Sequence, residues 1–148
     1  MRYIILVFIS VLFLACSNDS TNRNPYLQDI DFGFEINLNL PLYSPLTNIG
    51  SVVLINNNGV GIKGVYVIRT ISTEFPFQAF EASCPNHEPN SCSTLIANGQ
   101  VATCSCEGFK YSLFTGQPFN IPEDGSRYYD MKQYRTRFSG GNTVFISN

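Results

Sequence analysis

The chain has 148 residues, a formal net charge of −2 and only 14% charged residues. This length corresponds to one ordinary domain. The small net charge excludes the strongly basic surface typical of nucleic-acid-binding proteins, so we expect no nucleic-acid partner. Because hydrophobic residues make up 44% of the sequence, the chain can form a core and does not have the composition of a disordered protein.

The first fifteen residues have the pattern of a secretion signal. Arg2 precedes the apolar run YIILVFISVLFLA, and the small residue Ala15 comes directly before Cys16. This run is shorter than the ~20 residues that a membrane-spanning helix needs. The residues FLAC resemble a bacterial lipobox, although Phe13 stands where leucine is commoner. A plain signal peptide or a short transmembrane anchor is the alternative interpretation.

The lipobox resemblance implies that residues 1–15 are removed and that Cys16 is lipidated. Two or three acyl chains would hold the protein firmly on a membrane. We therefore expect a lipoprotein of the cell envelope, facing the periplasm or the cell surface. Residues 16–31 would comprise the lipidated cysteine and a flexible, polar tether.

The folded domain is expected to span residues 32–148 and to consist of strands. Its first strand is predicted by apolar residues at every second position from Phe32 to Leu40, which places one face inward and the other in water. Turn residues such as NNNG at 56–59 separate further short apolar runs. The other predicted strands cover residues 51–55, 61–71, 77–83, 100–104, 110–114, 128–138 and 142–147. Short strands separated by turns favour an all-β sandwich of antiparallel strands or a small barrel.

Cysteine chemistry is concentrated in the stretch CPNHEPNSCSTLIANGQVATCSCEG, residues 84–108. It contains the only histidine and every cysteine except Cys16. The cysteines form two groups about twenty residues apart, each following a predicted strand, so we expect two cysteine-bearing loops at one end of the sheet. Four cysteines in an exported protein also permit disulfides.

These two loops resemble those of a Rieske domain, in which one loop carries Cys-x-His and the other Cys-x-Cys-His-Gly. In that family the first cysteine and the histidine of each loop bind a 2Fe–2S cluster. A further cysteine in each loop forms a disulfide between the loops. The resemblance implies that Cys84 and Cys104 correspond to the ligand cysteines and that Cys92 and Cys106 form the disulfide.

The resemblance extends over roughly residues 33–147, but its specific motifs lie within 84–118. Gly108, Tyr111 and Gly116 match the stretch that follows the second loop in the family. Cys84 and Cys104 would be free thiols without a cluster, or a second disulfide if their Cα atoms approach within ~7 Å. Other pairings of the four cysteines stay open, and Cys104 with Cys106 is the least favoured because one intervening residue makes a strained ring.

The sequence departs from the Rieske pattern at both histidines. Asn86 occupies the first histidine position, with His87 one residue later, and Glu107 occupies the second. A carboxylate is poorly matched to cluster irons. We therefore expect a domain that has lost its cluster and has no cofactor, with 2Fe–2S as the cofactor if the family role is retained. The candidate metal site, a degenerate form of the family's cluster site, would consist of Cys84, His87, Cys104 and Glu107.

Three functions are compatible with these observations. The first is a non-enzymatic envelope lipoprotein that uses a Rieske-like domain as a structural or interaction module, with the membrane and an envelope protein as partners. The second is a 2Fe–2S electron-transfer protein with atypical ligands. The third is a thiol-redox or zinc-binding protein, in which Cys84, His87, Cys104 and one more cysteine could bind zinc.

Overall fold

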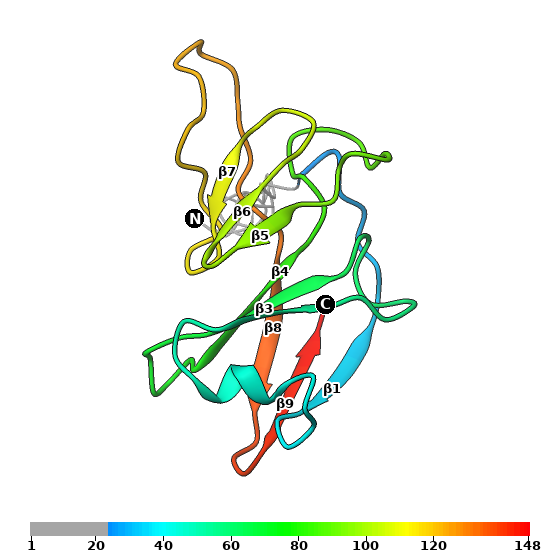
Figure 1. Ribbon diagram of the computed structural model, residues 1–148. Helices are drawn as coiled ribbons and strands as arrows, with labels where there is room; N and C mark the ends of the chain where they lie inside the picture. Colours follow the sequence, from blue (N-terminus) through cyan, green and yellow to red (C-terminus); the bar gives the residue numbers. More distant parts are fainter. Residues whose placement is uncertain (1–23) are drawn as a thin grey trace, which may run out of the picture.

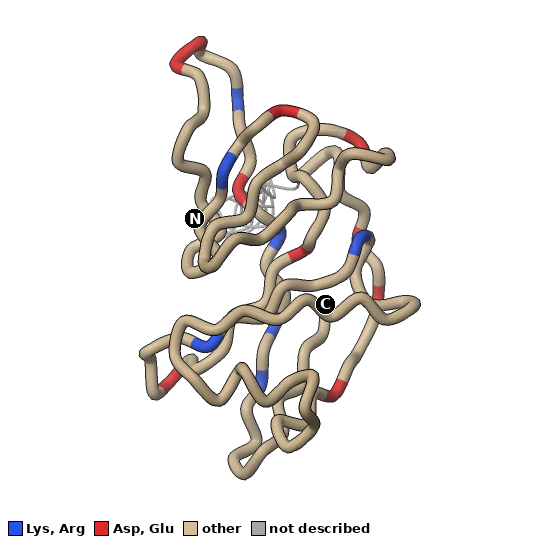
Figure 2. Tube along the Cα trace, viewed as in Figure 1, with Lys and Arg blue, Asp and Glu red and all other residues tan. Residues whose placement is uncertain are grey.

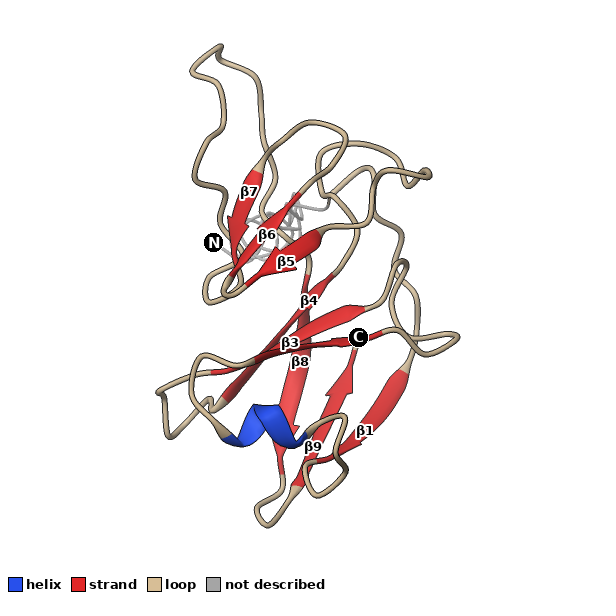
Figure 3. Cartoon of the chain, viewed as in Figure 1, coloured by secondary structure: helices blue, strands red, loops and turns tan. Residues whose placement is uncertain are grey.

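The computed structural model of the protein describes residues 24–148. The predicted signal peptide over residues 1–15 and the predicted lipidation of Cys16 lie outside this range. Nine strands and one short 3₁₀ helix, η2, make up the described part (Figure 3). Among residues 24–148, no helix combines the length and apolar character needed to cross a membrane.

Six strands form one antiparallel sheet in the order β1-β9-β8-β4-β3-β2, and three form a small sheet in the order β5-β6-β7 (Figure 1). The large sheet contains β1 (Gly33–Asn37), β2 (Val52–Ile55), β3 (Val65–Arg69), β4 (Phe77–Glu81), β8 (Gln133–Phe138) and β9 (Thr143–Ser147). The small sheet contains β5 (Ile96–Asn98), β6 (Val101–Thr103) and β7 (Lys110–Ser112). The predicted all-β fold of short antiparallel strands is confirmed.

Two apolar cores lie on opposite faces of β3. Val65 and Val67 belong to a core to which all six strands of the large sheet contribute, so this sheet curls around it. The alternate residues Tyr66 and Ile68 belong to a second core that includes side chains of β6 and β7. Because neighbouring strand residues point to opposite faces, β3 is buried on both sides and joins the two sheets.

The first predicted strand is correct in its alternation but too long. Ile36 and Leu38 are buried as expected, whereas Leu40 is 49% exposed. Strand β1 ends at Asn37 because the Leu40 N–H bonds back to the Asn37 carbonyl and opens a turn. The chain then forms η2 (Ser44–Thr47), which the sequence analysis did not predict, with Leu46 inserted into the first core.

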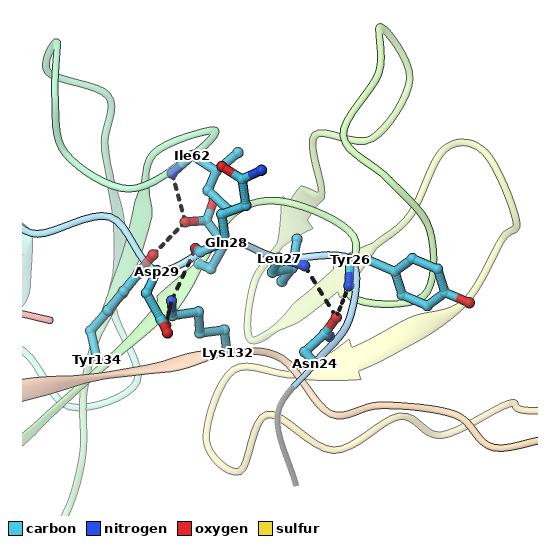
Figure 4. A network of polar contacts seen from close by, with 9 residues as sticks. Asn24, Tyr26, Leu27, Gln28, Asp29, Ile62, Lys132 and Tyr134 are labelled. Carbon is cyan, nitrogen blue, oxygen red and sulfur yellow. Dashed lines mark hydrogen bonds and ion pairs between the residues drawn. The ribbon is translucent and has the colours of Figure 1, made fainter. Parts of the chain in front are cut away.

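Residues 24–31, which were assigned to the tether, lie against the domain (Figure 4). The side chain of Leu27 is only 4% exposed. The Asn24 Nδ2 donates to the Pro85 carbonyl oxygen at 2.7 Å, and the Lys132 ammonium pairs with Asp29. The contacts of the domain therefore begin before the predicted boundary at residue 32.

Charged side chains are spread thinly over the described chain. Residues of both signs are scattered over the trace of the described chain (Figure 2). This distribution agrees with the low charge content of the sequence and gives no extended basic surface of the kind that binds nucleic acid.

Candidate functional site

The two cysteine-bearing loops connect β4 to β5 and β6 to β7, at one end of the molecule (Figure 1). Main-chain hydrogen bonds close the base of each loop. In the first loop, the Cys84 N–H donates to the Ser93 carbonyl at 2.7 Å. In the second, the Cys104 N–H donates to the Phe109 carbonyl, and the Gly108 N–H donates to the Cys104 carbonyl. The first loop thus leads from the large sheet to the small one, the second lies within the β6–β7 hairpin, and both are held by backbone bonds.

Two disulfides join the loops to each other. Cys84 is bonded to Cys104, with Cα atoms 5.7 Å apart, and both residues are fully buried. We call this pair the inner disulfide. Cys92 is bonded to Cys106, with Cα atoms 5.4 Å apart, and both residues are exposed. We call this pair the outer disulfide; it is the one that the Rieske resemblance implied, and the inner disulfide is the second bridge considered above.

His87 lies against the inner disulfide. Its Nε2 is 3.4 Å from the Cys104 Sγ, and its Nδ1 is 2.9 Å from the Glu88 carbonyl oxygen. The ligand atoms of Cys84, His87, Cys104 and Cys106 all lie within 4.8 Å of one another. The structure therefore brings together three of the four residues of the candidate metal site.

Glu107, the fourth residue of that set, does not belong to this group. Residues 105–108 form a tight turn, closed by the bond from the Gly108 N–H to the Cys104 carbonyl, and all four are exposed. Cys106 takes its place among the clustered donors because the outer disulfide draws its sulfur toward the first loop.

Asn86, at the position of the first Rieske histidine, connects the first loop to two other parts of the chain. Its Oδ1 accepts the Tyr129 N–H at 2.7 Å. Its Nδ2 donates to the Tyr111 hydroxyl at 2.8 Å and to the Tyr129 carbonyl at 3.2 Å. Both donor hydrogens and the acceptor of the amide are therefore used in holding the loop to β7 and to the segment before β8.

The residues gathered here do not fit a Rieske cluster. Such a cluster needs two thiolates on one iron and two imidazoles on the other. Cys84 and Cys104 are bonded to each other, and His87 is the single histidine of the chain. The amide of Asn86 is taken up by Tyr111 and Tyr129.

Glu81, the last residue of β4, supports the base of the first loop and was not singled out from the sequence. Its side chain is fully buried. The carboxylate accepts N–H bonds from Ile62, Lys63 and Ser83 at 2.8–2.9 Å and the hydroxyl of Tyr134 at 2.6 Å. The bonds from Ile62 and Tyr134 are visible in Figure 4. Four donors thus replace the water that the carboxylate loses on burial.

Replacing Asn86 with alanine should destabilise the domain by about 2 kcal/mol, because three partly buried hydrogen bonds are lost. The N–H and the carbonyl of Tyr129 then lose the partner that Asn86 provides. Urea unfolding measures the change. Asn90→Ala is the matched control, since the Asn90 side chain is exposed and its backbone partner is the N–H of Cys92, two residues away. A loss for Asn86→Ala no greater than that for Asn90→Ala would contradict the role of Asn86 as a connector.

Stability is expected to fall at alkaline pH because of Tyr111. Burial raises the pKa of its phenol from 10.0 to about 12, with an opposing contribution from the bond of Asn86. A tyrosine with a raised pKa stabilises the fold fully below pH 10, where both states are protonated, and this contribution is lost as the pH rises toward 12. Urea unfolding midpoints across this range, compared with those of Tyr111→Phe, provide the test. Equal slopes in the two proteins would contradict the prediction.

No model of a known protein family matches the sequence, and neither does any curated protein. Among solved structures, the protein is similar to a chain of the complex of reduced oxygenase and oxidized ferredoxin in carbazole 1,9a-dioxygenase. The TM-score is 0.48 and the sequence identity 18%, and the match covers 78% of this chain and 92% of that chain. A second similar structure is described as an NADH-dependent nitrite reductase small subunit from Mycobacterium tuberculosis; its TM-score is 0.45 and its identity 14%, covering 81% of this chain and 97% of that one. Similarities this distant carry no conclusion about function. The structure itself shows an all-β fold with two cysteine-bearing loops joined by two disulfides.

Proposed function

We propose that the protein is a lipoprotein of the cell envelope whose Rieske-like domain works without an iron–sulfur cluster, as a non-enzymatic structural or interaction module. The observation that carries this proposal is the inner disulfide. The two thiols that correspond to the cluster ligands, Cys84 and Cys104, are bonded to each other and fully buried. A cysteine in a disulfide has no thiolate to offer iron, and a thiolate is the form that binds metal.

The loops have polar contacts of a structural kind where the family has imidazoles. Asn86 bonds to Tyr111 and Tyr129, which fixes the first loop on the domain. Each disulfide closes a loop of moderate length and is worth about 3 kcal/mol on the chain-entropy estimate. The result is a rigid, covalently joined pair of loops at one end of the sheet, which suits a module that presents a surface to an envelope protein.

Membrane attachment is the second part of the proposal and is supported by the sequence alone. Cys16 follows an apolar run and a small residue, as in lipoproteins, and an exported protein is in a compartment where disulfides persist. In the test, Cys16→Ala should move the protein from the membrane fraction to the soluble fraction, and mass spectrometry of the wild type should find acyl chains on Cys16. An unmodified Cys16 in membrane-bound wild-type protein would overturn this part.

The cluster-free state is tested by metal analysis and thiol counting on protein purified anaerobically from its native envelope. We expect no stoichiometric iron and no free thiol until a reductant is added. Iron at two atoms per chain with a rhombic paramagnetic resonance signal after reduction would overturn the proposal in favour of an electron carrier. Cys84→Ser is the matched control for any iron that is found, since it removes one of the two ligand thiols.

A further inference from the structure

The inner and outer disulfides differ in access but lie close together through one sulfur. The inner disulfide is fully buried, so a reducing protein cannot reach it directly. The outer disulfide is exposed. The Cys106 sulfur, which belongs to the outer pair, lies within 4.8 Å of both sulfurs of the inner pair. Cys92 is not part of this close group.

We propose that the two disulfides form an exchange pair, in which opening of the outer disulfide by a protein dithiol allows Cys106 to open the inner one. The inference rests on the proposed cluster-free state, because Cys84 and Cys104 must be bonded to each other. It gives the domain a thiol-redox activity and a partner class, a dithiol reductant of the envelope.

The first step consumes one dithiol. A thiolate of the reductant attacks the Cys92 sulfur, the Cys92–Cys106 bond breaks, and Cys106 leaves as a thiolate. The second thiol of the reductant then releases Cys92 from the mixed disulfide. The reductant is oxidised to a disulfide, and the outer pair gains its two electrons.

The second step is an exchange without net oxidation. The Cys106 thiolate attacks the Cys84 sulfur, so that a Cys84–Cys106 bond forms while the Cys84–Cys104 bond breaks and Cys104 leaves as a thiolate. Attack on Cys84 is favoured over attack on Cys104, because a disulfide between residues 104 and 106 would close a strained ring around one intervening residue. After this exchange, the two thiols of the reduced domain are the exposed Cys92 and the buried Cys104.

His87 is placed to assist the departure of Cys104. Its Nε2 is 3.4 Å from the leaving sulfur, and its Nδ1 faces the Glu88 carbonyl at 2.9 Å. In the tautomer that carries its proton on Nε2, the ring can donate a hydrogen bond to the departing Cys104 sulfur. A hydrogen-bond donor beside a developing thiolate stabilises it and makes it a better leaving group.

The experiment compares two single variants of the full chain, each with one half of the outer disulfide removed. In Cys92→Ser the Cys106 thiol is free from the start, and in the matched control Cys106→Ser the Cys92 thiol is free instead. Both are incubated at mildly alkaline pH, alkylated and mapped by non-reducing peptide mass spectrometry. We expect Cys84–Cys106 peptides with alkylated Cys104 in Cys92→Ser, and an intact inner disulfide in Cys106→Ser. An intact inner disulfide in both variants would overturn the proposal.

A rate measurement tests the same coupling in wild-type protein. With dithiothreitol as the reductant, the inner disulfide should open at least about tenfold more slowly in Cys92→Ser/Cys106→Ser than in the wild type, because the intramolecular attacker is missing. Equal rates would contradict the exchange.

His87→Ala should slow the exchange several-fold, with partial recovery on addition of free imidazole, which a purely structural role of His87 would not give. Iron in the purified protein would instead refute the cluster-free state, so the two proposals fail by different measurements.

Discussion

Replacing Glu81 with alanine is expected to lower the free energy of unfolding by about 3–5 kcal/mol, because the partners of a fully buried carboxylate are left without an acceptor. Three backbone N–H groups and the Tyr134 hydroxyl converge on this carboxylate. Two of the N–H groups belong to the turn between β2 and β3, and the third is that of Ser83, just before Cys84. The loss would therefore loosen both the turn and the first cysteine-bearing loop.

Two further variants separate the carboxylate from its partners. Tyr134→Phe removes one donor and should cost about 1–2 kcal/mol. Glu81→Gln keeps one acceptor oxygen but turns an NH₂ group toward backbone N–H donors, so its cost should lie between the other two. Urea unfolding measures all three. A cost for Glu81→Ala no larger than that for Tyr134→Phe would show that the carboxylate is not the centre of the network.

The phenol of Tyr134 gives an independent measurement of the same contact. Burial raises its pKa, and the charge and hydrogen bond of Glu81 raise it further. In Glu81→Gln the phenol should ionise at lower pH than in the wild type, while burial still holds its pKa above the usual range. Titration of the phenolate absorbance, with Tyr134→Phe to identify the signal, follows this change.

The turn around Glu81 also explains a glycine. Gly61 has φ +67°, and a Cβ at this position would lie 2.8 Å from the Glu81 Oε2. Both the backbone conformation and the space therefore require glycine. The sequence analysis placed Gly61 at the start of a strand over residues 61–71, whereas β3 begins at Val65 and Gly61 lies in the preceding turn. The reason for this glycine lies in a carboxylate twenty residues away.

Strand positions were predictable because they depend on local patterns. The apolar runs of β2, β3, β4, β6 and β9 were found within a few residues of their observed bounds. Strand β5 was missed because Ile96 and Asn98 are exposed, so the segment lacks the apolar alternation of a half-buried strand. It exists because the following hairpin pairs it with β6.

The contacts that position the site could be predicted only in part. The cysteines were found because their chemistry and spacing are visible in one short stretch. The partners of Asn86 and Glu81 were not, since Tyr129 and Tyr134 lie 43 and 53 residues further along the chain. A signal for Glu81 was nevertheless present: it shares the inward face of β4 with Phe77 and Ala79, where a charged residue needs buried partners.

The last prediction concerns the relative contributions of the two disulfides. Their sequence separations are 20 and 14 residues, so loop-closure entropy alone gives each about 3 kcal/mol and makes the inner one only slightly stronger. Packing makes a larger difference. Cys84 and Cys104 belong to the second apolar core together with Tyr66 and Tyr111, whereas the outer pair is exposed. Removal of the inner pair therefore also leaves unfilled space in a core.

We expect Cys84→Ala/Cys104→Ala to cost about 1–2 kcal/mol more than Cys92→Ala/Cys106→Ala, since truncation in a packed interior adds a cavity cost that an exposed site does not have. Urea unfolding of both double variants under non-reducing conditions gives the comparison. Alanine is used at all four positions so that the side chain left behind is the same. If the outer pair contributes as much as the inner one, loop closure alone determines the stabilisation and the packing of the inner sulfurs adds nothing. If the inner pair contributes more, its two sulfurs stabilise the domain as part of the second apolar core as well as by closing a loop.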